Sequence, residues 1–138
     1  MDVLIVAKAN TTQQIEDGLR NYLFPDVRIT SVPLVELAER HLVYSSPDYV
    51  IVVGSHPVKK LGAFSELLSR SGSRLLMADS LREKHYVLRR AGRKAAAKIL
   101  ERGESVVSAI GREVDSLRAF RVLQTVNAIV ETERRLAA

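Results

Sequence analysis

The sequence predicts an α/β domain with a doubly wound parallel sheet of four to five strands and an additional C-terminal helix. Short apolar runs recur, and the strongest, residues 49–53, has the continuous pattern of a strand covered on both faces. Segments of about a dozen residues with apolar positions at helical spacing separate these runs. The stretch from 104 to 136 contains no proline and one glycine, which favours a long helix. Alternation of strand and helix predicts βαβ units and a parallel sheet.

The expected elements up to residue 80 alternate between strand and helix. In chain order they are a strand at 3–6, a helix at about 12–23, a half-exposed edge strand at 27–31, a helix at 34–42, a strand at 49–53, a helix at 61–68 and a strand at 75–77.

The chain after Asp79 is harder to interpret. Residues 81–90 are expected to form a helix that Gly92 stops. Residues 95–100 stay open between a fifth strand and a helix, because their alanines favour a helix and only tertiary contacts would make them a strand. The C-terminal segment either bends near Asp115 or runs as one helix. We divide the chain into a domain at 1–117 and a helical extension at 118–138.

Composition limits the function classes. The 138 residues are 46% hydrophobic and 27% charged, which is typical of one folded domain. The chain has no cysteine, and its three histidines lack metal-ligand spacing, so neither a disulfide nor a metal site is expected. No GxGxxG or Walker A motif indicates a cofactor. The apolar runs are too short to span a bilayer and the start lacks a basic signal region, so we expect a cytoplasmic location and no membrane contact.

Catalysis is not expected either. Ser55 and His56 are the residue types of a nucleophile and its base, but sequence neighbours usually point apart. No G-x-S-x-G turn surrounds Ser55. We therefore expect a protein that is not an enzyme.

The order of the elements resembles the receiver domains of two-component response regulators, which have a flavodoxin-like fold. Residues 3–6 look like the first strand of that family and residues 47–53 like its third. Pro57 stands four residues past the position of the phosphoacceptor, and Ala91-Gly92 resembles the pair before the fifth strand. The resemblance covers roughly residues 2–117.

The chain departs from that family where phosphotransfer occurs. Val53 stands in place of the phosphoacceptor aspartate, and a valine can neither accept a phosphoryl group nor bind magnesium, which prefers oxygen ligands. The resemblance thus implies a pseudo-receiver that aspartyl phosphate does not switch. The degenerate phosphotransfer positions are Ala7, Lys8, Val53, Ala78 (or Asp79) and Lys98.

Two other regions are candidate binding sites. The carboxyl edge of the sheet, where open α/β sheets bind ligands, would present residues 8–12, 54–60 and 79–80. Within it, backbone N–H groups and basic side chains could hold a small anion at Gly54, Ser55, His56, Lys59 and Lys60. Between Arg82 and Arg102, eight bases stand against two acids. That surplus could meet nucleic acid or an acidic partner through Arg82, Lys84, Tyr86, Arg89, Arg90, Arg93 and Lys94, with Tyr86 stacking on a base.

The C-terminal extension carries surplus apolar residues, namely Phe120, Leu123, Val126 and Val130. Apolar surface of this kind is normally buried against another chain, and a homodimer is the commonest outcome. The preferred function is a non-enzymatic regulatory or scaffolding module that acts by protein–protein contact, through its fourth and fifth helices and the extension. The alternatives are a nucleic-acid-binding regulator using residues 82–102 and a small-anion or nucleotide sensor at 54–60.

Overall fold

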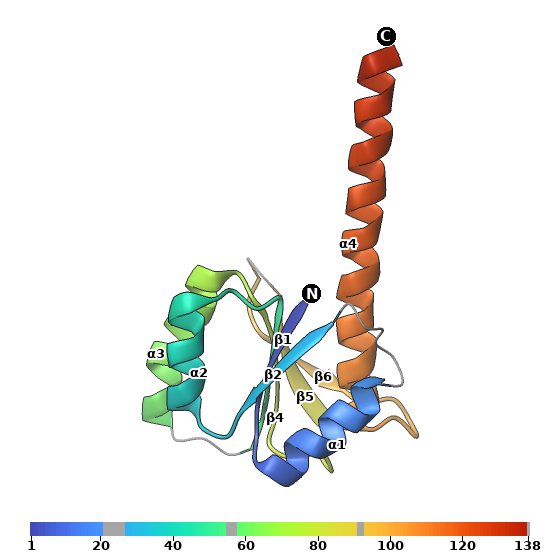
Figure 1. The fold of residues 1–138 in the computed structure, drawn as a ribbon. Helices are drawn as coiled ribbons and strands as arrows, with labels where there is room; N and C mark the ends of the chain where they lie inside the picture. The colour runs from blue at the N-terminus through green and yellow to red at the C-terminus, as the bar shows by residue number, and fades with distance from the viewer. Residues whose placement is uncertain (21–26, 55–57, 91–92, 138) are drawn as a thin grey trace.

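The computed structural model describes residues 1–20, 27–54, 58–90 and 93–137, and it contains one six-stranded mixed sheet with helices on both faces (Figure 1). The strand order is β2-β1-β3-β4-β5-β6. In chain order the elements are β1 (Asp2–Val6), α1 (Ala9–Arg20), β2 (Arg28–Val32), α2 (Val35–Tyr44), β3 (Tyr49–Val53), α3 (Val58–Ser71), β4 (Arg74–Ala78), β5 (His85–Arg89), β6 (Ala96–Ile99) and α4 (Val106–Ala137).

The first four strands run parallel, with β1 between β2 and β3 and with β4 beside β3. All five residues of β3 are buried, because apolar clusters cover both of its faces. One cluster includes the inner sides of α1 and α4, and the other includes those of α2 and α3. The edge strand expected near residues 27–31 is present as β2, which is mostly exposed.

The prediction of a doubly wound parallel sheet of four to five strands is wrong, because the sheet has six strands and is mixed, with β5 running opposite to its two neighbours. β5 pairs antiparallel with β4, and β6 pairs antiparallel with β5. The structure describes every residue between β4 and β5, and no helix lies there. The flavodoxin-like arrangement therefore stops after β4.

The helix expected at 81–90 is replaced by a turn and a strand. In β5 the side chains of Tyr86 and Leu88 are buried and alternate with more exposed neighbours, so the two-residue period of a strand prevails over helical spacing. Residues 96–99 form β6 although alanine favours helix. Their backbone pairing with β5 is the tertiary context that selects the strand.

The C-terminal segment is one continuous helix of 32 residues, α4, about 48 Å long at 1.5 Å per residue. It begins after Ser105, whose hydroxyl oxygen accepts the N–H of Ser108 at 3.1 Å as an N-cap does. Its first turns pack on the sheet, where Ile110, Val114 and Leu117 are buried. From Ala119 to Ala137 every residue is exposed, and this part projects beyond the body of the molecule (Figure 1).

Candidate functional site

Four of the five degenerate phosphotransfer positions meet at the carboxyl ends of adjacent strands. Ala7 and Lys8 follow β1, Val53 ends β3 and Ala78 ends β4. The N–H of Gly54 donates to the carbonyl of Ala78 at 2.9 Å, which joins two of these ends. Val53 and Ala78 are buried, so the floor of this region is apolar.

Lys98 does not join them. It lies on β6, and β4 and β5 separate β6 from β3. Three inter-strand spacings correspond to roughly 14 Å. The resemblance matched Lys98, with one residue deleted, to the lysine at the end of the family's fifth strand, which assumed an all-parallel order that the sheet does not have.

A cleft of about 660 Å³ opens at the same carboxyl edge. We call it the carboxyl-edge cleft. It lies where the sheet order reverses between β1 and β3, the place at which open α/β sheets bind ligands. Its lining comes from the segments after four parallel strands and from α1 and α2, and consists of Lys8, Thr11, Gln14, Pro33, Leu34, Val35, Glu36, Val53, Gly54, Asp79, Ser80, Leu81 and Arg82.

The first turn of α2 borders this cleft without a side-chain cap. Its N-cap residue is Leu34, which makes no capping hydrogen bond, whereas Ser, Thr, Asp or Asn is preferred there. The Leu34 side chain is 53% exposed and forms part of the cleft wall. The backbone N–H groups of that turn thus lack a side-chain acceptor of the usual kind.

Only part of the anion site expected at 54–60 can be placed. Gly54 lines the cleft and has φ of 126°, a backbone conformation that favours glycine. Ser55 and His56 lie outside the described residues. Lys59 and Lys60 belong to α3, but their side chains also lie outside the described part.

Pro33, Leu34 and Arg82 also line the cleft, and the sequence did not indicate that they would. Arg82 was expected on a basic surface, and no role was expected for the turn after β2, at Pro33 and Leu34. Open α/β sheets bind ligands beyond the carboxyl ends of their strands, and this holds for the second strand as well as for the first and third. The segment after the second predicted strand could therefore have been identified from the sequence.

The basic residues between 82 and 102 do not form one surface. The Arg89 guanidinium donates to the hydroxyls of Ser65 and Ser69 on α3, whereas Arg90 approaches Glu113 of α4, on the other side of the sheet, at 3.9 Å. Arg93 and Lys94 line a shallow groove of about 420 Å³, and Arg82 lies at the carboxyl-edge cleft. Lys84 lies in the turn before β5.

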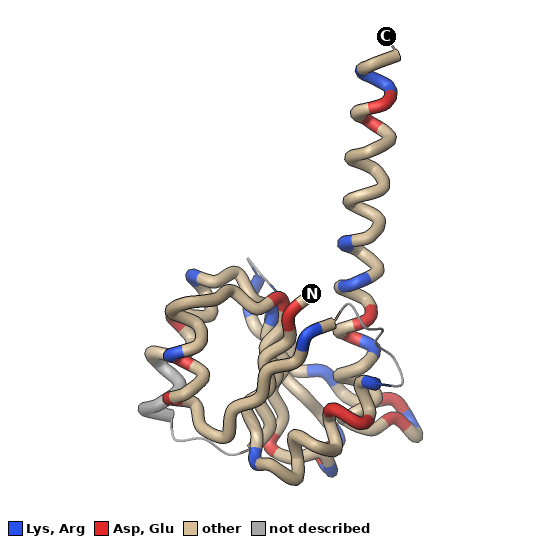
Figure 2. The backbone as a smooth tube through the Cα atoms, in the orientation of Figure 1, with Lys and Arg blue, Asp and Glu red and all other residues tan. Residues whose placement is uncertain are grey.

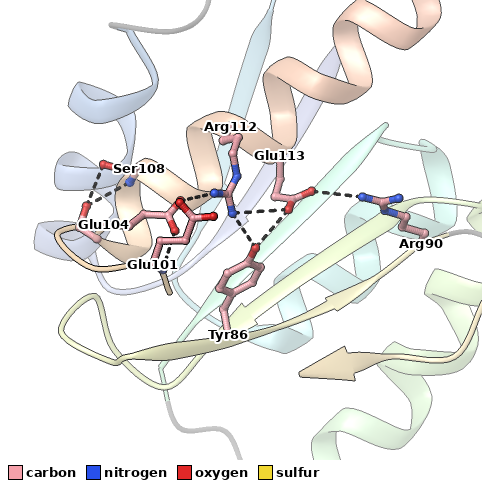
Figure 3. Close-up of polar contacts among 8 residues, drawn as sticks. Tyr86, Arg90, Glu101, Glu104, Ser108, Arg112 and Glu113 are labelled. Atoms are coloured by element: carbon pink, nitrogen blue, oxygen red, sulfur yellow. Dashed lines mark hydrogen bonds and ion pairs between the residues drawn. The ribbon is translucent and has the colours of Figure 1, made fainter. Parts of the chain in front are cut away.

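Tyr86 is part of the core instead of the surface, since its side chain is only 2% exposed. Its hydroxyl donates to Glu113 at 3.1 Å and accepts from Arg112 at 3.0 Å (Figure 3). Arg112 also pairs with Glu104 at 2.6 Å. Burial, followed by the nearby Glu113 carboxylate, raises the pKa of Tyr86. These contacts hold α4 on β5, and they leave no exposed ring to stack on a base.

Tyr49 is buried at the start of β3, and its hydroxyl has no hydrogen-bond partner among the described residues. Burial is the main reason why its pKa is raised above the ordinary value for tyrosine, and Glu113 adds to the shift. Arg74 pairs with Tyr49 across β3 and β4, and burial and Arg90 lower the Arg74 pKa.

The projecting half of α4, residues 118–137, has an unusual surface. Residues 122–130 contain no charged side chain, although all of them are exposed (Figure 2). Charges lie at both ends of this stretch, with Arg118 and Arg121 before it and Glu131 and Glu133 after it. A solvated helix normally carries charged residues on its outer face. The uncharged stretch is therefore typical of a surface that another molecule covers.

The apolar residues of this half form one stripe, which we call the distal stripe. At about 100° per residue, Val126 and Leu117, nine residues apart, point to opposite sides of the helix. Leu117 faces the sheet, so the distal stripe faces away from its own domain. The stripe consists of Ala119, Val122, Leu123, Val126, Ile129 and Val130.

The candidate dimer residues from the sequence lie on or beside this stripe. Leu123, Val126 and Val130 belong to it, and Phe120 lies on its flank; all four side chains are at least 40% exposed. Val122 and Ile129 were missed. The alternating spacing of three and four residues through 119, 122, 126 and 129 is the signal that would have found them.

Among the described residues, no helix is long and apolar enough to cross a membrane, and no group of three or more His, Cys, Asp or Glu side chains could hold a metal ion. Comparison of the chain with protein-family models, with curated proteins and with solved structures found no match.

Proposed function

We propose that the chain is a non-enzymatic regulatory or scaffolding module that works as a homodimer, with the projecting half of α4 as its dimerisation element. The observation that carries this proposal is the distal stripe, because it is apolar, exposed and turned away from the sheet on which the first turns of α4 pack. The cytoplasmic location expected from the sequence remains a prediction.

The projecting half of α4 would be only marginally stable as an isolated helix in water. Isolated helices shorter than about 12–15 residues are marginal in water even with good helix formers, and longer ones depend on packing of an apolar face. The 19 residues from 119 to 137 contact nothing that buries them. Packing against another helix would supply the missing stabilisation.

The exposed apolar area suits a dimer. Seven large apolar side chains of α4 are exposed: Phe120, Val122, Leu123, Val126, Ile129, Val130 and Leu136. Burial of such a side chain contributes about 1.5–3 kcal/mol. At ~25 cal/mol per Å², this energy corresponds to a buried area of about 60–120 Å² per side chain. Seven give roughly 400–800 Å² per protomer, which approaches the ~800 Å² per partner of a specific interface.

A second copy is the occupant that the pattern favours. Residues 119, 122, 126 and 129 follow the spacing of a coiled-coil seam, with Ala119 and Val126 at a positions and Val122 and Ile129 at d positions. The distal stripe lies on the face of α4 opposite Leu117, which packs on the sheet, so a second copy can meet the stripe without displacing that contact. Of the partner surface expected on the fourth and fifth helices, the fourth helix is absent, because residues 85–89 form β5, whereas the fifth corresponds to the first turns of α4.

Sedimentation of a matched pair of variants tests the proposal. Val126→Glu places a charge in the centre of the distal stripe, and Gln124→Glu places the same charge about 160° away on the same helix. We expect the wild-type chain and Gln124→Glu to sediment as dimers and Val126→Glu as a monomer. A monomeric wild-type chain at ~100 μM, or a dimeric Val126→Glu, would overturn the proposal.

The absence of cysteine allows a second, geometric test. A single Val126→Cys variant should oxidise to a disulfide-linked dimer, because seam positions of paired helices come within the roughly 7 Å Cα separation that a disulfide needs. Gln124→Cys should not. If Val122→Cys and Ile129→Cys also cross-link, the helices are parallel; if neither does, they are antiparallel and cross near Val126.

A further inference from the structure

The carboxyl-edge cleft has the size and the position of a small-molecule site. Its volume of about 660 Å³ falls within the roughly 300–1,000 Å³ of ligand pockets. Because β1 leads to β2 on one side and β3 lies on the other, the segments after β1 and β3 diverge and leave a crevice between them. None of the residues of the projecting half of α4 lines it.

Two positive side chains enter the lining from opposite sides. Lys8 follows β1, and Arg82 lies in the turn between β4 and β5. Neither forms an ion pair with a residue that the structure describes. The turn that carries Arg82 is held by Ser80, whose hydroxyl oxygen accepts the Arg82 N–H at 3.2 Å and whose carbonyl accepts the Glu83 N–H at 3.4 Å. The cleft thus offers a guanidinium, on a turn with a held backbone, and an ammonium to an anion.

Backbone N–H groups supply further hydrogen-bond donors beside Lys8 and Arg82. The first turns of α1 and α2 both contribute to the lining, and helix N-termini favour negative charge. In α2 the N-cap residue, Leu34, makes no side-chain capping hydrogen bond. A phosphate oxygen could accept hydrogen bonds from these N–H groups while Lys8 and Arg82 balance its charge.

The apolar and acidic residues of the cleft suit the organic part of a phosphate ester, namely a ring and hydroxyl groups. Pro33 and Leu34, after β2, provide apolar surface against which a flat ring can pack, and Leu81 adds apolar surface after β4. Asp79 and Glu36 provide carboxylates, which accept hydrogen bonds from hydroxyl groups. An inorganic anion would contact only the basic residues of this lining. A nucleotide would contact the basic residues with its phosphate, the apolar residues with its base and the carboxylates with its ribose.

We infer that the carboxyl-edge cleft binds a mononucleotide, with Lys8 and Arg82 at the phosphate, Leu34 and its apolar neighbours at the base, and Asp79 at the ribose hydroxyls. Val53 lines the cleft and cannot accept a phosphoryl group, so we assign nucleotide binding and no phosphoryl transfer to this site. This makes the module a ligand sensor, and it goes beyond dimerisation, because α4 takes no part in the cleft.

Calorimetric titration of the full chain with the four nucleoside monophosphates tests this inference. We expect at least one to bind saturably, and inorganic phosphate and ribose 5-phosphate to bind ~10-fold or more weakly, because they lack the base. Lys8→Gln and Arg82→Gln should each weaken the nucleotide ~10-fold or more, as expected for loss of a charge-assisted contact. Lys98→Gln removes the same charge from β6, outside the cleft, and should leave affinity unchanged.

A fourth variant examines the base. Leu34→Ala removes part of the apolar surface but adds no side-chain acceptor that would compete with the phosphate for the N–H groups of α2. Because Leu34 is 53% exposed, this variant should fold normally. It should weaken the nucleotide more than ribose 5-phosphate. Each of three results would overturn the inference: no saturable binding of any monophosphate up to ~10 mM, unchanged affinity in both Lys8→Gln and Arg82→Gln, or an equal loss in Lys98→Gln. Val126→Glu should bind like the wild type, so failure of this inference and failure of the dimer remain distinguishable.

Discussion

The carboxylate of Asp48 forms an ion pair with the guanidinium of Arg121, which lies 73 residues further along the chain. The other carboxylate oxygen of Asp48 accepts the backbone N–H of Asp2 at 2.7 Å. Asp48 immediately precedes β3, and Arg121 lies where α4 leaves the sheet. One side chain therefore joins β1, β3 and the root of the projecting helix.

We expect this ion pair to contribute about 0.5–1 kcal/mol to the free energy of unfolding, because Arg121 is half exposed and solvent screens the pair. Asp48→Asn removes the charge and keeps an oxygen for the Asp2 N–H. Urea unfolding of Asp48→Asn, Arg121→Gln and the double variant, all in the Val126→Glu background to avoid dimer effects, measures the coupling. Additive effects at low salt would show that the pair contributes nothing; a real coupling should shrink as salt rises.

The same substitution at two buried tyrosines should have opposite effects on stability. Tyr49→Phe removes a buried hydroxyl without a described partner and should stabilise the protein by about 1 kcal/mol. Tyr86→Phe takes a hydrogen-bond partner from both Arg112 and Glu113 and should destabilise it by about 1–2 kcal/mol. Chemical denaturation of the two variants decides this, and destabilisation in both would indicate that the Tyr49 hydroxyl has a partner in solution.

The raised pKa of Tyr49 implies a loss of stability at alkaline pH. In the unfolded chain a tyrosine ionises near pH 10, whereas burial keeps the Tyr49 phenol protonated in the folded state. The associated stability is fully present below about pH 10 and declines above it, by up to about 1.4 kcal/mol per pH unit for this residue. Tyr49→Phe should therefore decline less steeply than the wild type between about pH 10 and 11. Tyr44→Phe, at a side chain that is 90% exposed, is the control and should follow the wild type.

The elements that the sequence predicts well are those in which local pattern and tertiary environment agree. β3 is an uninterrupted apolar run and is buried at every position. The alternation of 27–31 predicts an edge strand, and β2 is one. In the sequence of α4 the helical spacing of the apolar residues shifts after Leu117, so that the later residues lie on the opposite side of the helix. The structure explains the shift, because only the residues up to Leu117 pack on the sheet.

Local pattern could not predict β5 and β6, because each forms a strand through its pairing with a neighbouring strand. β6 is made of helix-favouring alanines, and all four of its residues are exposed, so no burial pattern indicates a strand. It exists through its backbone pairing with β5, whose own residues 85–89 contain three apolar positions in a row that match helix and strand alike. The error about Lys98 follows from this, because the resemblance supplied a parallel fifth strand that the chain replaces with a hairpin.

Gly18 marks the close contact of α1 with α4. A Cβ atom at position 18 would overlap with Cγ1 of Val107, a β-branched side chain with few alternative rotamers. Gly18→Ala should therefore destabilise the protein by about 1–3 kcal/mol, although alanine is the better helix former. In the Val107→Ala background the overlap disappears, and the same substitution should instead stabilise by about 0.5–1 kcal/mol through helix propensity. Thermal or urea unfolding of the four proteins measures this reversal of sign. If Gly18→Ala has the same sign in both backgrounds, the two helices are not packed closely enough at this point for Val107 to require a glycine opposite it.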